Sequence, residues 1–283
     1  MSRRVAGAAI SGAVVLTVGG AVAAVWAGTA AGQSVVDDGP DVLVAAAFTG
    51  LGAVLVAARP GNRVTWLLMT VGVTWATAGG SLAAGLLGVS QPGLVPWTSA
   101  WLLVGSALRT VAWYLAVLGL AIYFPTGQVL GRRWRWLPWA LAVSVLATVA
   151  NGLVDPGANL DISGWHNPVG LPPSLGFVET VTFLVGPPLA VVAGCFAVAQ
   201  LVRRWRPGGP VERRQLGLFL AAAVPPVVAA PVGLAGGGPW VFYAAVLPLP
   251  LAVAVAVGRS GTSPRGSASR STWTSYATTS SPR

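Results

Sequence analysis

Few side chains in this chain could act in catalysis or ligand binding, and two of the ionisable ones lie inside long apolar runs. Arg109 is the one arginine within such a run, and Glu179 is the one acidic residue within another. A charge at the centre of a bilayer costs about 2.5–3.5 kcal/mol on insertion scales, so these side chains should face protein or water. We therefore predict an ion pair between Arg109 and Glu179 that joins their two helices. The alternative is that Arg109 extends outward to lipid headgroups or caps a short, late-starting helix in the fourth run.

A second candidate is the segment around His166, the only histidine of the chain, with Asp161 nearby. A histidine titrates near neutral pH, so His166 and Asp161 are candidate sensing residues in a loop between two apolar runs. One histidine and one aspartate do not make a metal site, which takes three or four ligands. We predict no bound metal, and a solvated loop histidine is the alternative reading.

Signatures of known catalytic sites are absent from the sequence. It holds no Walker loop, no His-Glu-x-x-His pattern and no Gly-x-Ser-x-Gly elbow, and its apolar runs hold no pair of carboxylates. The single cysteine, Cys195, cannot form a disulfide within the chain. We therefore predict no catalytic residues, no cofactor and no enzymatic activity.

The elements that must position these residues are apolar runs of membrane-spanning length. Charged residues make up 8% of the chain and apolar residues 54%, against about 25% and 45–50% in soluble domains. A helix needs about 20 apolar residues to cross a bilayer. Eight runs approach that length, at 5–27, 41–58, 64–88, 99–124, 137–154, 177–202, 215–236 and 239–257. The sequence predicts an all-α, polytopic transmembrane bundle of about eight helices, with the lipid bilayer as its main partner.

The distribution of charge predicts how this bundle is oriented. All 17 basic residues are arginines, and every one except Arg109 lies in alternate gaps between the apolar runs. Asp37, Asp38, Asp41, Asp155 and Asp161 lie in the other gaps. Arginine-rich short loops stay on the cytoplasmic side, so we predict that both termini are cytoplasmic and that the protein lies in the cell (plasma) membrane. The net charge of +10 is therefore a sign of topology, and no nucleic-acid partner is expected.

The chain divides into a membrane domain and a tail. Residues 1–258 form the predicted multi-pass domain, and residues 259–283 are rich in Ser, Thr and Arg with almost no apolar residues. Such a composition cannot bury enough apolar surface to fold, so the tail is predicted to be disordered.

Four loop segments resemble the N-terminal membrane region of actinobacterial sensor histidine kinases. Ala58–Leu68 resembles that family's Arg-Pro-Gly-Asn segment, and Tyr123–Trp134 its Phe-Pro-Asp-Gly-Arg…Arg-Arg-Trp segment. Asn167–Leu171 resembles an outer Asn-Pro-Leu-Gly loop, and Val211–Leu216 a Val-Glu-Arg-Gln-Gln-Leu segment. The four occur in the family's order and on the same predicted sides over about residues 55–257. Thr126 and Gln128 depart from the family, which often has Asp and Arg at these positions.

The resemblance implies a sensory input region of a two-component system, located in an inner membrane. Such kinases continue into a phosphoacceptor helix and an ATP-binding domain, neither of which is recognisable in these 283 residues. We therefore expect a truncated or frameshifted kinase gene, with output through a homodimer or a separate kinase or response-regulator chain. The alternative function is a small multi-pass transporter or channel.

Overall fold

The computed structural model describes residues 3–156, 162, 165–234 and 243–259. Within these residues the fold is helical, with no strand. The first half contains α1 (Arg3–Ala30), α2 (Val35–Ala58) and α3 (Arg63–Ser90). A fourth long helix follows as α4 (Thr98–Tyr114), a π-helical turn (Leu115–Gly119) and α5 (Leu120–Tyr123).

The second half repeats this pattern of long helices and short turns. A 3₁₀ turn (Arg132–Trp134) leads into α6 (Trp136–Val154), and another (Pro173–Leu175) leads into α7 (Gly176–Trp205). The chain then forms α8 (Pro210–Leu234) and a last apolar helix, Tyr243–Val257, whose final part is α10 (Pro248–Arg259).

Six of the described helices are long and apolar enough to cross a membrane. They are Arg4–Ala30, Gly39–Ala58, Arg63–Ser90, Thr98–Tyr123, Arg132–Val154 and Pro173–Trp205. These helices correspond to the first six predicted runs. The prediction of an all-α fold with helices of membrane-spanning length is therefore confirmed for these six. One boundary was wrong: α2 begins at Val35, which places Asp41 inside a helix and not in an outer gap. The predicted run 239–257 includes residues 239–242, which lie outside the described residues, as does the tail from 260 onward.

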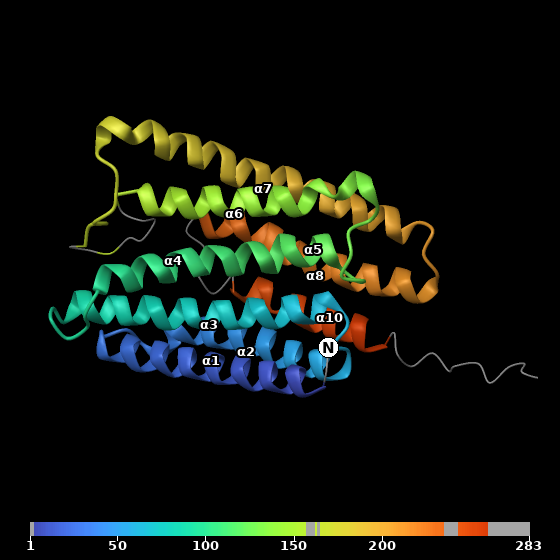
Figure 1. The fold of residues 1–283 in the computed structure, drawn as a ribbon, viewed down its shortest axis with the longest axis horizontal. Helices are drawn as coiled ribbons and strands as arrows, with labels where there is room; N and C mark the ends of the chain where they lie inside the picture. Colours follow the sequence, from blue (N-terminus) through green and yellow to red (C-terminus); the bar gives the residue numbers. More distant parts are fainter. Residues whose placement is uncertain (1–2, 157–161, 163–164, 235–242, 260–283) are drawn as a thin grey trace, which may run out of the picture.

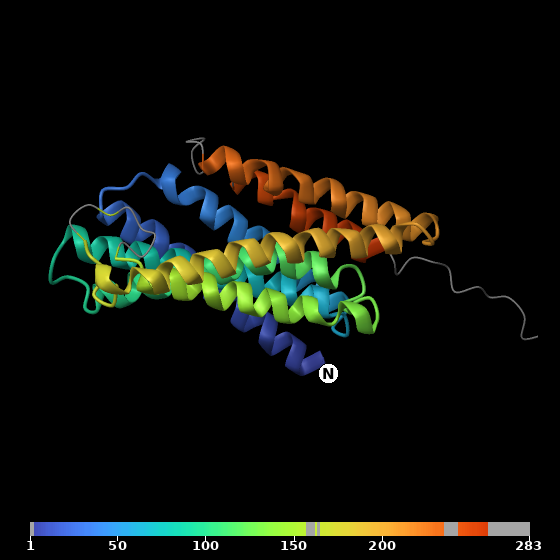
Figure 2. The same ribbon diagram turned by 90° about the horizontal axis from the view of Figure 1, so that it is seen from above.

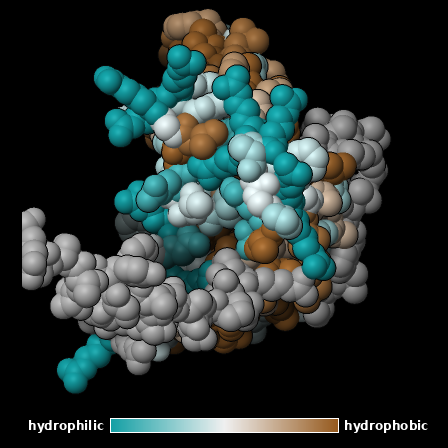
Figure 3. All heavy atoms as spheres, turned by 90° about the vertical axis from the view of Figure 1, so that its right-hand side faces the viewer, coloured by the Kyte–Doolittle hydropathy of each residue, from teal (hydrophilic) through white to brown (hydrophobic). Residues whose placement is uncertain are grey.

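The helices lie side by side along one long axis (Figure 1). The α2–α3, α5–α6 and α7–α8 connections, the N-terminus and the end of α10 all lie at one end of this bundle. Seen from above, α8 and α10 lie along one side, and the start of α1 projects on the opposite side (Figure 2). Hydrophilic residues gather on the end face that carries the arginine-bearing turns (Figure 3). The arginine-bearing turns therefore gather at one end of the bundle.

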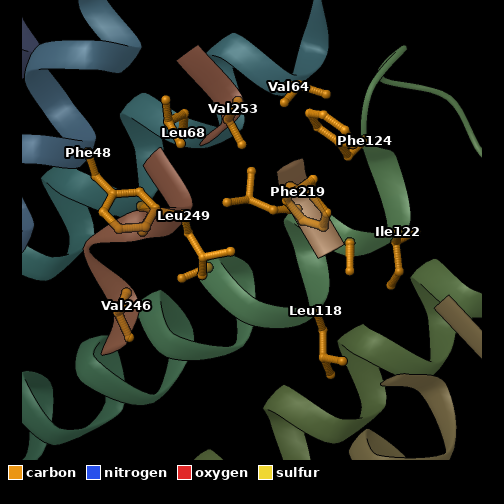
Figure 4. Packing of buried hydrophobic residues seen from close by; sticks show 14 of the residues in the cluster. Phe48, Val64, Leu68, Leu118, Ile122, Phe124, Phe219, Val246, Leu249 and Val253 are labelled. Atoms are coloured by element: carbon orange, nitrogen blue, oxygen red, sulfur yellow. The ribbon is translucent and has the colours of Figure 1, made fainter. Parts of the chain in front are cut away.

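The buried core brings the last helix into the middle of the bundle. Val246, Leu249 and Val253 are fully buried and belong to one cluster with residues of α2, α3, α5 and α8 (Figure 4). Within it, the rings of Phe124 and Phe219 stack with centroids 4.3 Å apart. The last helix is thus held between elements from both halves of the chain.

Candidate functional site

The central polar site of the bundle is built around Arg109 on α4. Its Nη2 donates a hydrogen bond to Oδ2 of Asp41 on α2 at 2.6 Å, and this contact is also an ion pair. Its Nη1 donates to the hydroxyl of Tyr243, at the start of the last helix, at 2.7 Å. One side chain therefore connects three helices that are far apart in the sequence.

Trp75 of α3 completes this network. Its Nε1–H donates to Oδ1 of Asp41 at 2.8 Å, so each carboxylate oxygen of Asp41 accepts a hydrogen bond from a different helix. The Arg109 guanidinium lies over the Trp75 ring at 5.5 Å and over the Tyr243 ring at 6.0 Å, within the range of cation–π attraction. We call Asp41, Trp75, Arg109 and Tyr243 the Arg109 network.

Burial makes the pairing of the two charges necessary. The side chains of Arg109 and Asp41 are 22% and 17% exposed, and both lie within helices of membrane-spanning type. An unpaired charge there would lose its hydration without compensation, whereas a hydrogen-bonded pair is neutral overall. The network can therefore persist in a low-dielectric environment.

A cavity of about 360 Å³ adjoins the network on the side of α4 and α6. Its lining is mostly aromatic and consists of Trp75, Arg109, Thr110, Trp113, Tyr114, Thr148 and Tyr243. On this lining, the hydroxyls of Tyr114 and Thr148 are hydrogen-bonded to each other at 2.7 Å. The cavity thus combines apolar walls with a few polar groups, which is typical of small-molecule sites.

The predicted pairing of Arg109 with Glu179 is corrected by this arrangement, because the partner of Arg109 is Asp41. Glu179 lies in the first turn of α7, which packs chiefly against α6 and not against α4. Its backbone carbonyl accepts a hydrogen bond from Nδ2 of Asn151 on α6 at 3.0 Å, a contact that joins α6 to α7.

The candidate sensing loop is described only in part. His166 is exposed, and Asp161 lies outside the described residues. Across the described parts of the chain, no group of three or more His, Cys, Asp or Glu side chains could hold a metal ion. Asn167, which follows His166 in the chain, is buried and orders the loop, because its Nδ2 donates to the carbonyls of Leu153 and Asp155.

A second polar cluster fixes the turn that follows α5. Arg204 of α7 donates to the carbonyls of Phe124 and Gln128 at 3.1 and 2.6 Å, and to the Thr126 hydroxyl at 3.3 Å. One turn earlier, Gln200 donates to the carbonyl of Ile122 at 2.8 Å and accepts from the amide of Leu130 at 3.2 Å. We call Gln200 and Arg204 the α7 clamp.

The four segments that carry the family resemblance have packing roles. Asn62 caps α3 through Val64 and donates to the carbonyl of Pro125, which joins the first segment to the second. Asn167 orders the loop that follows α6, as described above. Gln215 donates to the carbonyl of Ala256 at 2.6 Å and so joins α8 to α10 near the arginine-rich end. These residues hold turns and helices in place, and none of them lines the cavity.

Sequence reasoning singled out Arg109 but not its three partners. Asp41 was counted with the outer loops because it stands at the edge of an apolar run. Trp75 stands in the middle of its run, where a role in anchoring at the membrane surface does not apply, and this position was an available signal. No pattern in the sequence singles out Tyr243.

Comparison with known proteins adds no relative: no protein-family model, no curated protein and no solved structure matches this chain.

Proposed function

We propose that this chain is the sensory input region of a membrane signalling protein, and that the Arg109 network links its outer half to its last helix. The observation that carries the proposal is the 2.7 Å hydrogen bond from Arg109 to Tyr243. Tyr243 begins the last helix, whose other end lies with the arginine-bearing turns. A signal that changes this hydrogen bond would act directly on the last helix, whose far end lies with the arginine-bearing turns.

The packing of the last helix supports transmission along its length. Leu249 and Val253 are buried in the same cluster as Phe48 of α2 and Leu68 of α3. Near its end, Ala256 accepts the hydrogen bond of Gln215 from α8. The last helix is therefore held near both ends. A switch needs an element with two packings that a signal favours unequally.

We further propose the topology and partners that this function requires. Eight helices would cross the plasma membrane, with both termini in the cytoplasm; the gathering of arginine-bearing turns at one end supports this orientation. The resemblance to sensor histidine kinases favours output through a second copy of the chain or through a separate kinase or response-regulator chain. The gene neighbourhood tests this part, since an adjacent kinase fragment or response regulator is expected.

The alternative is a small transporter or channel, and the cavity beside Arg109 is the observation that favours it. A transporter needs a path that opens in turn to both sides of the membrane. Proteoliposomes separate the two functions: a solute or ion flux that the Arg109→Gln substitution abolishes would favour transport over sensing.

The sensory proposal is tested by the position of the last helix. Spin labels are placed at Val255→Cys on the last helix and Trp139→Cys on α6, in a Cys195→Ser background; both labelled positions are exposed. Tyr243→Phe removes only the hydroxyl that Arg109 contacts, and it is expected to shift the distance between the labels. The matched control is Glu179→Gln, which lies outside the network. An identical distance distribution in both variants would contradict the proposal that the Arg109 network controls the position of the last helix.

A further inference from the structure

Positive charge collects at the arginine-bearing end of the bundle, and little of it is neutralised there. Residues 125–136 and 203–214, which connect the helices at this end, hold eight arginines and one acidic residue, Glu212. Arg204 is buried in the α7 clamp, and the other seven arginines are exposed. Figure 3 shows the hydrophilic face that results. A surface with this excess of one sign attracts anions.

One of these arginines is held on an aromatic ring. The guanidinium carbon of Arg203, in the last turn of α7, lies 5.6 Å from the ring centroid of Trp134, in the turn before α6. This contact uses the flat face of the guanidinium, so the N–H groups in its plane remain available to a ligand. Arg133 and Arg135 stand directly beside Trp134 in the chain, with Cα atoms about 3.8 Å from its own, and both are exposed. Three cationic side chains therefore start from one small area.

An exposed aromatic surface continues from this area toward the middle of the bundle. Trp134 and Trp136 both lie edge-on to Phe196 of α7, with ring centroids 6.2 and 5.1 Å apart. Phe196 is seven residues before Arg203, which places the two on the same face of α7, about 10.5 Å apart along its axis. Phe196 is 46% exposed and Trp136 is 36% exposed. The cationic and aromatic surfaces are therefore adjacent, and both are open to a ligand.

The combination of these two surfaces decides which ligand chemistry fits. Guanidinium groups bind phosphate oxygens through charge-assisted hydrogen bonds. The aromatic surface belongs to α6 and α7, two helices long and apolar enough to cross a membrane, so its natural contact is hydrocarbon. An acidic protein segment in water would cover the arginines but would leave this surface without a partner. A ligand with an anionic headgroup and an apolar chain satisfies both.

From these observations we propose that the surface between α6 and α7 binds a phospholipid with a negatively charged headgroup. The headgroup phosphate accepts hydrogen bonds from Arg203 and from the arginines beside Trp134, and an acyl chain lies along Trp136 and Phe196. We call this surface the headgroup site. Binding there goes beyond the sensory function proposed above and is independent of it. It requires only that α6 and α7 span a bilayer, in either orientation.

The proposal is tested by native mass spectrometry of the full chain in detergent micelles, which resolves each bound lipid and gives the dissociation constant of the first. The probe is phosphatidylglycerol, and the comparison lipid is phosphatidylcholine with the same chains, whose headgroup has no net charge. Phosphatidylglycerol should bind at least about tenfold more tightly, since several arginines face its charge. Equal affinity for the two lipids would overturn the proposal.

Substitution of Arg203 separates a defined site from general attraction to a cationic protein. Arg203→Gln should weaken phosphatidylglycerol binding about fivefold. The matched control is Arg4→Gln, which removes the same charge from an exposed position on α1, on the opposite side of the bundle from α7 (Figure 1). The control should change the affinity less than about twofold. Both positions are exposed, so the thermal unfolding of both variants should match that of the parent protein. Equal weakening by the two substitutions would contradict the headgroup site.

Substitution of Phe196 tests whether the ligand is a lipid. Phe196→Ala removes part of the surface for the acyl chain and should weaken phosphatidylglycerol binding at least about threefold. Phe183→Ala is the control, because Phe183 is also exposed on α7 but lies about 20 Å farther along the helix. Binding that depends on Arg203 but not on Phe196 would indicate a soluble acidic partner and contradict the lipid. Equal losses in the two phenylalanine variants would contradict the position of the site.

Discussion

The Nη2 atom of Arg109 lies 2.6 Å from Oδ2 of Asp41, so two residues 68 positions apart form an ion pair between α4 and α2. Neither charge depends on this contact alone, because Tyr243 accepts from Arg109 and Trp75 donates to Asp41. The pair therefore joins four segments of the chain through hydrogen bonds that are strengthened by the low dielectric around them.

We predict that Arg109 and Asp41 are energetically coupled. Breaking a buried pair leaves one charge uncompensated, so Arg109→Gln and Asp41→Asn should each lower the free energy of unfolding by about 3 kcal/mol. The double variant should lose clearly less than the sum of the two. Unfolding in mixed detergent micelles measures this cycle. A parallel cycle of Arg109→Gln with Glu179→Gln should be additive within about 0.5 kcal/mol, and strong coupling there would contradict the assignment.

The hydrogen bond of the Trp75 indole should contribute measurably to stability. Trp75→Phe keeps an aromatic ring in a fully buried position but removes the donor to Asp41. We expect a loss of about 1–3 kcal/mol in the free energy of unfolding, from the lost bond and the smaller ring. Trp26→Phe serves as control, since Trp26 is 64% exposed on the outside of α1, and it should change stability little.

Close packing of α2 on α3 should make Gly52 intolerant of a side chain. A Cβ added there would lie 2.5 Å from the backbone nitrogen of Met69, so the helices would have to separate. Gly52→Ala should destabilise the protein by about 1–3 kcal/mol. Gly50 on the same helix is exposed and has nothing within 4 Å of such a Cβ. Gly50→Ala should therefore be neutral or slightly stabilising, and equal losses at both positions would argue against this interface.

The α7 clamp should protect the turn after α5 from proteolysis. Arg204→Met removes the donors to Phe124, Thr126 and Gln128, so the segment with Arg132, Arg133 and Arg135 should be cleaved faster by trypsin. The control is Arg206→Met, which removes the same charge from an exposed position nearby. Peptide mapping after limited digestion of the purified protein measures the rate at this turn. Equal cleavage in both variants would contradict a clamp.

The proposed orientation predicts which turns are accessible from outside the cell. In a Cys195→Ser background, Leu94→Cys lies in the α3–α4 connection and Arg132→Cys in the α5–α6 turn, and both positions are exposed. A membrane-impermeant maleimide should label only the first in intact cells and both after permeabilisation. Labelling of Arg132→Cys in intact cells would reverse the orientation.

The positions and lengths of the helices could be predicted because they depend on local features. An apolar run of about 20 residues becomes a helix in lipid whatever its neighbours, and arginines near its ends set its direction. The first six predicted runs correspond for this reason to the six described helices that are long and apolar enough to cross a membrane. The sequence alone also showed that Arg109 is the one arginine inside an apolar run.

The partners of Arg109 were decided only by the tertiary structure. In a membrane bundle, surfaces that face lipid and surfaces that face protein are both apolar, so periodicity does not reveal which side of a helix packs on which neighbour. Glu179 was the expected partner because it lay inside a run, yet α7 packs against α6 and the charge within reach is Asp41. The sequence determined that Arg109 needs a partner; the register of α2, α3, α4 and the last helix determined that the partners are Asp41 and Tyr243.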